Sequence, residues 1–138
     1  MTTLLAILIA VAQLLAWWML AMVLHECGHV ATALALDVKV QRVGIRWRGL
    51  YTMFQTDTPL RTFLIILAGP LSNLYLALIF AGRHCEVFVF FNLVNGVANL
   101  LPVPGSDGWQ AGKIVWRAVG SRQLPVASSQ LPVSGGGQ

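Results

Sequence analysis

The stretch that decides the fold lies near the N-terminus, over residues 4–29, and reads LLAILIAVAQLLAWWMLAMVLHECGH. Up to Leu24 its only strongly polar side chain is Gln13, and at about 1.5 Å per residue such a run can cross a hydrocarbon core of roughly 30 Å. A cleaved signal peptide is the alternative, but the chain starts MTT, without Lys or Arg, and no small-residue cleavage site follows the run. The stretch therefore predicts a membrane-spanning helix over about residues 4–30, with ionisable side chains at its C-terminal end.

The composition of the whole chain also indicates a membrane protein. Of the 138 residues, 57% are hydrophobic and only 10% are charged, whereas about a quarter are charged in an ordinary soluble domain. The formal net charge is +4, but the basic residues form no run, so a nucleic-acid partner is not expected. This composition argues against a cytosolic enzyme and against a disordered segment. The length of the chain suits one domain.

Two further apolar segments follow, over about residues 62–81 and 87–101. The first is interrupted by Gly69 and Pro70. The second carries three asparagines, and because asparagine is costly in contact with lipid, this helix should turn its polar face toward protein or a wet cavity. The asparagines are Asn92, Asn95 and Asn99. The expected fold class is therefore a membrane all-α core of three transmembrane helices.

The segments outside these spans are predicted from their own patterns. Residues 38–56 alternate apolar and polar side chains between glycines, which predicts a short β-hairpin between the first two spans. This hairpin is either a plain loop or a sheet edge that an extended peptide could join. A Pro/Gly-rich loop then leads to an interfacial helix over about residues 108–119. The core would fill residues 1–120, and residues 121–138, which are Gly-rich near their end, are predicted to be a flexible tail.

The basic residues orient the predicted spans. Between the first and second spans lie Lys39, Arg42, Arg46, Arg48 and Arg61, and after the third lie Lys113, Arg117 and Arg122. Only Arg83 lies between the second and third spans. Because Lys and Arg gather on the cytoplasmic side, we expect a multi-pass plasma (inner) membrane protein whose N-terminus is outside and whose C-terminus is cytoplasmic.

The HECGH sequence at the end of the first span can bind a metal ion. His25 and His29 are four residues apart, so both imidazoles lie on one face of a helix and can reach one ion. Glu26 lies about 100° round the helix from His25, within reach of a water on that ion without being a ligand. Zinc suits such a set. The alternative is a polar cluster that only caps the span.

A catalytic zinc ion normally has three protein ligands, so a third is needed. The five carboxylates of the chain are Glu26, Asp37, Asp57, Glu86 and Asp107. Spans one and three run in the same direction, so Asp107 emerges on the side of the two histidines, whereas Glu86 lies on the opposite side. Asp107 is therefore the best third ligand, and the alternative is an ordinary aspartate in a Pro/Gly turn.

With these motifs in order, the chain resembles the site-2 proteases, a family of intramembrane zinc metalloproteases. HECGH at residues 25–29 matches the family's His-Glu-x-x-His motif. GPLSN at residues 69–73 matches the second motif, a Gly followed four residues later by a small residue or Asn in the middle core helix. NLLPVPGSDG at residues 99–108 matches the third, Asn-x-x-Pro-x-Pro-x-x-Asp-Gly. Ser106 and Trp109 depart from the usual third motif, which affects the packing of that loop more than ligation.

The resemblance implies a role for each matched residue. The zinc ligands, one ion per chain, would be His25, His29 and Asp107, and the catalytic base would be Glu26. Asn99 matches a residue that holds the substrate backbone or the oxyanion, which makes it both catalytic and substrate-binding. Asn73 falls on the polar position of the second motif and is a candidate substrate-binding residue. The hairpin resembles the family's β segment, which clamps an unwound substrate.

The implied function is that of an intramembrane zinc endopeptidase. It would cut in or next to transmembrane segments of membrane-anchored proteins near the cytoplasmic face, as in regulated intramembrane proteolysis. The expected partners are the lipid bilayer and a substrate such as an anti-sigma or pro-sigma factor. A separate regulatory membrane protein is expected too, because the chain has no room for a PDZ or CBS domain. The alternatives are a catalytically inactive relative that binds membrane segments, and a metal carrier or channel subunit, which a single metal site disfavours.

Overall fold

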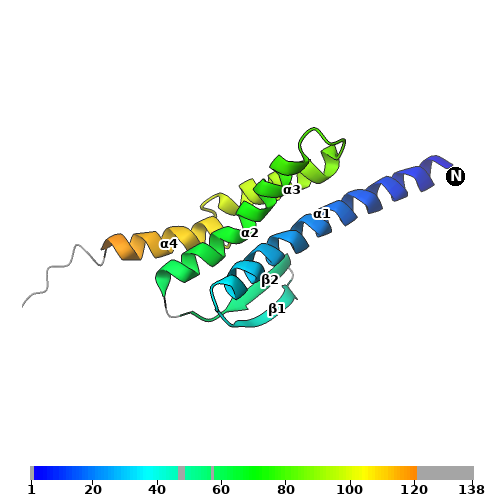
Figure 1. The fold of residues 1–138 in the computed structure, drawn as a ribbon. Coiled ribbons are helices and arrows are strands. Elements are labelled where there is room, and N and C mark those ends of the chain that lie inside the picture. The colour runs from blue at the N-terminus through cyan, green and yellow to red at the C-terminus, as the bar shows by residue number, and fades with distance from the viewer. Residues whose placement is uncertain (1, 47–48, 57, 121–138) are drawn as a thin grey trace, which may run out of the picture.

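The computed structural model describes residues 2–46, 49–56 and 58–120 (Figure 1). Within these ranges the elements follow in the order α1 (Thr2–Ala35), β1 (Val40–Arg46), β2 (Gly49–Phe54), α2 (Pro59–Phe80), α3 (Glu86–Leu100) and α4 (Asp107–Gly120). The tail predicted over residues 121–138 lies outside the described residues, as does Asp57. The described part of the chain is thus mostly helical with one small sheet, as the sequence predicts.

Two of the described helices are long and apolar enough to cross a membrane. In α1, which has 34 residues, only 6% of the most apolar 18-residue window is buried inside the protein, against 33% in the 22-residue α2. Such exposure of apolar side chains fits a lipid environment. The apolar α3 has 15 residues, about 22 Å of helix, which is short for a hydrocarbon core of roughly 30 Å. The third predicted span therefore stays a prediction.

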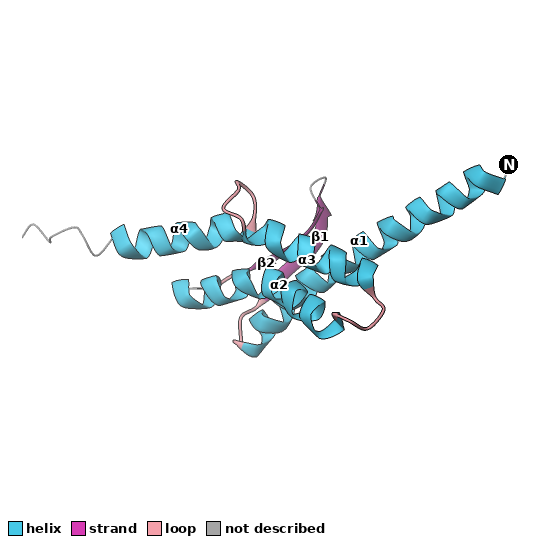
Figure 2. Ribbon diagram, turned by 90° about the horizontal axis from the view of Figure 1, so that it is seen from above, coloured by secondary structure: helices cyan, strands magenta, loops and turns pink. Residues whose placement is uncertain are grey.

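Helix α2 lies at the centre of the molecule and contacts each of the other three helices. Figures 1 and 2 show the N-terminal part of α1 projecting beyond the bundle. The apolar core is small and gathers where the end of α1, the start of α2 and the hairpin meet. Its buried members are Ala33, Val38 and Ile65, with Phe54 of β2 packed against them. This packing holds the hairpin beside the C-terminal part of α1.

Helix α1 continues to Ala35, beyond the predicted end near residue 30. It stops where Asp37 takes a positive φ of 53° and the Val38 N–H donates to the Ala33 carbonyl at 2.8 Å. This reversal turns the chain directly into β1. The histidine pair consequently lies inside a continuous helix, with at least one further turn after His29.

The predicted hairpin is present as two antiparallel strands. Val43 pairs with Thr52 and Gly44 with Tyr51, with an irregularity between Val40 and Arg42. Strand β2 makes more contacts with α1 than β1 does. The inner strand of the hairpin, β2, is therefore the one nearer the histidine pair.

Helix α4 begins at Asp107, so this residue occupies the first helical position rather than a free turn. The Ser106 hydroxyl accepts a hydrogen bond from the Trp109 N–H at 3.1 Å and so caps the helix. A Cβ on Gly108 would overlap the Leu100 carbonyl, which shows how closely α4 starts against the end of α3. These local contacts place Asp107 at the start of α4, against the end of α3.

Candidate metal centre

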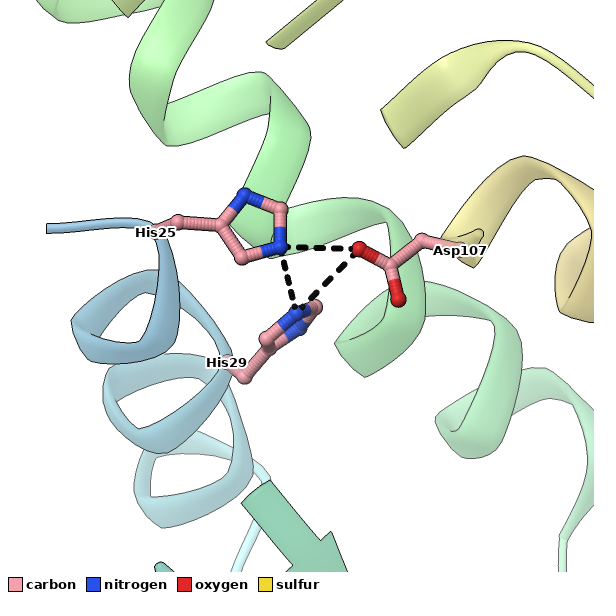
Figure 3. A group of neighbouring side chains, drawn as sticks. All are labelled: His25, His29 and Asp107. Atoms are coloured by element: carbon pink, nitrogen blue, oxygen red, sulfur yellow. Dashed lines mark hydrogen bonds and ion pairs between the residues drawn. The ribbon is translucent and has the colours of Figure 1, made fainter. Parts of the chain in front are cut away.

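Three side chains from two helices meet at one point (Figure 3). His25 Nε2 lies 2.9 Å from Asp107 Oδ2, and His29 Nε2 lies 3.4 Å from the same oxygen. The two Nε2 atoms are 3.2 Å apart. Both histidines are buried, with 6% of each residue exposed. The structure thus brings together the three residues that the sequence selects as ligands.

The spacing of these three atoms can be compared with that of zinc ligands. Ligand atoms about 2.0–2.1 Å from zinc at tetrahedral angles lie about 3.3–3.4 Å from one another. The observed separations of 2.9, 3.2 and 3.4 Å approach one triangular face of such a tetrahedron. His29 Nδ1 donates to the Ile65 carbonyl at 2.7 Å, which leaves Nε2 as the nitrogen with a free lone pair. The residues present therefore fit a zinc ion.

The ionisation state of Asp107 suits a metal ligand. Burial raises the pKa of its carboxyl group, but hydrogen bonds with His25 and His29, together with the attraction of the two rings, outweigh burial and hold the pKa below its ordinary value. The group is consequently a carboxylate at neutral pH, the form that binds metal ions.

Gly69 of α2 makes room for the two imidazole rings. A Cβ at this position would overlap the His29 ring and would lie 2.8 Å from His25 Nε2. Gly28 of α1 has a similar role, since a Cβ there would lie 2.7 Å from the Ala68 carbonyl oxygen of α2. Both glycines let α1 and α2 approach closely beside the histidine pair.

Two asparagines fix α1 just before the histidines. The side-chain amide of Asn73, which is fully buried, donates to the Ala21 carbonyl at 3.0 Å, and the amide of Asn95 reaches the same oxygen at 3.5 Å. In an α-helix this carbonyl also accepts the backbone N–H of His25. Asn73 does not line the cavity described next, and its substrate-binding role stays a prediction.

A cavity of about 480 Å³ opens beside the three side chains. Its walls come from all four helices, from β2 and from the loop before α4. Of the predicted site residues, the walls include the three candidate ligands together with Glu26 and Asn99. The sequence pattern indicated Asn95, as part of the polar face of the third span, and the hairpin as a whole. The other lining residues are Trp18, Met22, Leu50, Tyr51, Thr52, Phe54, Ile66, Gly105 and Gln110, and none of these was singled out from the sequence as a site residue.

Glu26 and Asn99 have defined partners in this cavity. Glu26 Oε2 accepts a hydrogen bond from the Thr52 hydroxyl at 2.5 Å. The Asn99 amide donates to the backbone oxygen of Asn95 at 3.0 Å and to its side-chain oxygen at 3.1 Å. To donate to a substrate, Asn99 would have to exchange one of these bonds.

The remaining described carboxylates lie elsewhere. Glu86 is exposed in the first turn of α3, and Asp37 is exposed after the end of α1, beside a different cavity. Among the described residues, the group of His25, His29 and Asp107 is the one arranged to hold a metal ion. Asp57 lies outside the described residues.

Comparison with known proteins gives curated relatives, among them the two that follow, and no matching family model. The chain is 30% identical over 119 residues to Stage IV sporulation protein FB of Bacillus subtilis, a match that covers 78% of this chain and 40% of that protein. It is 28% identical over 143 residues to the protein named "Putative zinc metalloprotease Rip2" of Mycobacterium tuberculosis, covering 72% of this chain and 55% of the relative. The chain therefore spans about half the length of the curated relatives it matches, or less.

Proposed function

Because the chain is related to the site-2 protease family through three ordered motifs and two curated relatives, we propose that it is an intramembrane zinc endopeptidase. The observation that carries this proposal is the triangle of His25 Nε2, His29 Nε2 and Asp107 Oδ2 at separations of 2.9–3.4 Å. The triangle borders a cavity that Glu26 also lines. Candidate metal ligands, a candidate base and a cavity thus lie side by side, which supports the proposal.

In the proposed reaction each residue has one task. His25, His29 and Asp107 hold the zinc ion, which when bound polarises the scissile carbonyl and lowers the pKa of the attacking water. Glu26 takes a proton from that water and returns it to the leaving amine, a role worth about 10² to 10⁴ in rate. Asn99, on the cavity wall, holds the substrate backbone or the developing oxyanion.

The substrate is a membrane-anchored protein cut in or next to its transmembrane segment. A helical substrate keeps its carbonyls in its own hydrogen bonds and must unwind to present one of them. Strand β2 lines the cavity through four residues, Leu50, Tyr51, Thr52 and Phe54. Pairing of an extended segment with the hairpin would compensate for the lost bonds. Candidate substrates are anti-sigma and pro-sigma factors, with a separate membrane protein as regulator.

The proposed location of the site is the cytoplasmic side of the plasma (inner) membrane. Helix α1 then runs from outside to inside, α2 returns, and α3 crosses again, so that α4 lies at the inner surface. The basic residues of the loops on either side favour this orientation. His25 and Asp107 meet at one depth because α1 and α3 run in the same direction.

The test is the conservative variant Glu26→Gln, co-expressed with a panel of single-span membrane proteins. We expect it to keep its zinc and to lose cleavage by about 10² to 10⁴, measured as cleaved product on gels. Glu86→Gln, which changes an exposed carboxylate at the start of α3, is the matched control and should cut like the parent. Equal processing by Glu26→Gln and the parent would exclude the proposed hydrolysis. A parent that binds the spans and leaves them whole would favour the inactive relative.

A further inference from the structure

The carboxylate of Glu26 is tied to the hairpin by one hydrogen bond. The Thr52 hydroxyl donates to Glu26 Oε2 at 2.5 Å, in a part-buried position. Bonds between a hydroxyl and an ionised carboxylate are short and about twice as strong as neutral ones. The two residues are 26 positions apart in sequence, so the bond joins the histidine-bearing helix α1 to β2.

The hairpin holds Thr52 firmly in this position. Alternate residues of a strand share a face, and Leu50, Thr52 and Phe54 of β2 all line the cavity. Phe54 packs on the buried cluster of Ala33, Val38 and Ile65, two residues beyond Thr52. Thr52 is also paired with Val43 of β1, and a β-branched side chain has few χ1 alternatives. The hydroxyl is therefore preorganised before a substrate arrives.

Glu26 needs such support because its own side chain is flexible. A glutamate side chain can rotate about three torsions. A displacement of a reacting group by about 1 Å can lower the rate by about 10²-fold. A hydrogen bond to Oε2 fixes the plane of the carboxylate and leaves Oε1 to receive the proton. Thr52 thus suits a base that must face the metal centre without binding the metal.

We propose that Thr52 is a positioning residue that orients the Glu26 carboxylate for proton transfer, and that β2 thereby links substrate binding to the chemical step. This inference rests on the proposed endopeptidase function. The strand that would pair with an unwound substrate also carries the group that holds the base. A substrate that pairs with β2 therefore lies against the strand that already holds Glu26 in place.

The experiment compares Thr52→Val, which removes the hydroxyl at nearly constant shape, with Thr52→Ser, which keeps it. The full chain is purified in detergent, and kcat and KM are measured on a labelled single-span peptide that the parent cleaves. We expect Thr52→Val to lower kcat by about 10- to 100-fold with KM within about twofold, and Thr52→Ser to recover most of the activity. Zinc content should equal that of the parent in both variants.

A matched control is Thr62→Val, which removes an α2 hydroxyl that donates to the carbonyl of Thr58, the residue before the helix, away from the cavity. It should leave kcat and KM unchanged. In the Glu26→Gln background, measured at high enzyme concentration, Thr52→Val should cost nothing further, because its effect passes through Glu26.

Three outcomes would overturn the role of Thr52. The first is a Thr52→Val variant with the kcat of the parent, and the second is a Thr52→Val variant in which KM alone changes. The third is a Thr52→Val substitution that lowers kcat as much in the Glu26→Gln background as in the parent. Each of these leaves the endopeptidase proposal standing. A parent that cleaves no membrane peptide overturns both proposals, so the two failures are distinguishable.

Discussion

Gly69 and Asn73 lie one turn apart on α2 and act on the same stretch of α1. Gly69 leaves space for the rings of His25 and His29, and Asn73 donates to the Ala21 carbonyl one turn before His25. Residues four apart share a helix face, so one face of α2 provides both the space and the anchor. The Gly-x-x-x-Asn spacing of the second motif therefore has a packing explanation in this structure.

Gly69→Ala is expected to weaken zinc binding. The added Cβ would overlap the His29 ring, and such overpacking typically costs about 1–3 kcal/mol, which corresponds to a roughly 5- to 150-fold loss of affinity. Zinc affinity can be measured by competition with a chelator. Gly112→Ala is the control, because a Cβ on this α4 glycine meets nothing within 4 Å. Parental affinity in Gly69→Ala would contradict the role given to Gly69.

At the scale of elements, α3 and α4 together deliver Asp107. Ser106 caps α4, and Gly108 allows its first turn to lie against the end of α3. Asn95 links α3 to the Ala21 carbonyl of α1. The position of Asp107 therefore depends on the placement of α3, which has 15 residues.

We expect α3 to cross the membrane completely, and cysteine labelling can test this. In a chain without Cys27 and Cys85, Ala81→Cys places a thiol before α3, and Gly112→Cys places one after it, both at exposed positions. An impermeant maleimide added to intact cells should label residue 81 and should label residue 112 only after the membrane is opened. Labelling of both positions in intact cells would contradict a full crossing.

Spacing along the sequence predicts some of the site and misses the rest for a physical reason. The positions of His25 and His29 follow from helix geometry, and Asp107 follows once two parallel spans are assumed. The contact between Thr52 and Glu26 depends on the register of the hairpin and on the packing of Phe54. Such contacts are set by tertiary structure, so local pattern does not reveal them.

The boundaries of the helices and strands also differ in whether local sequence pattern predicts them. The predicted end of α1 near residue 30 was early, because the helix continues until the reversal at Asp37, which has a positive φ. The hairpin between the first two spans is confirmed by the pairing of β1 with β2. The alternation and the glycines of residues 38–56 were sufficient to predict it, since turn chemistry is local.

At the scale of the whole molecule, few buried apolar residues hold the described chain together. The buried apolar cluster comprises Ala33, Val38 and Ile65, whereas α1 exposes large apolar side chains along most of its length. Such a surface fits contact with lipid. Polar contacts beside the candidate metal centre, from Asn73 and Thr52 among others, connect the helices and the hairpin where apolar packing is sparse.

The most direct test of the account is the zinc content of the detergent-purified full chain, measured by elemental analysis after dialysis. We predict about one zinc per chain in the parent and in the control Glu86→Gln. In the double variant His25→Ala with Asp107→Ala we predict almost none, because one imidazole cannot retain the ion alone. Full zinc occupancy in the double variant, or a parent that binds no zinc, would contradict the assignment of the metal centre.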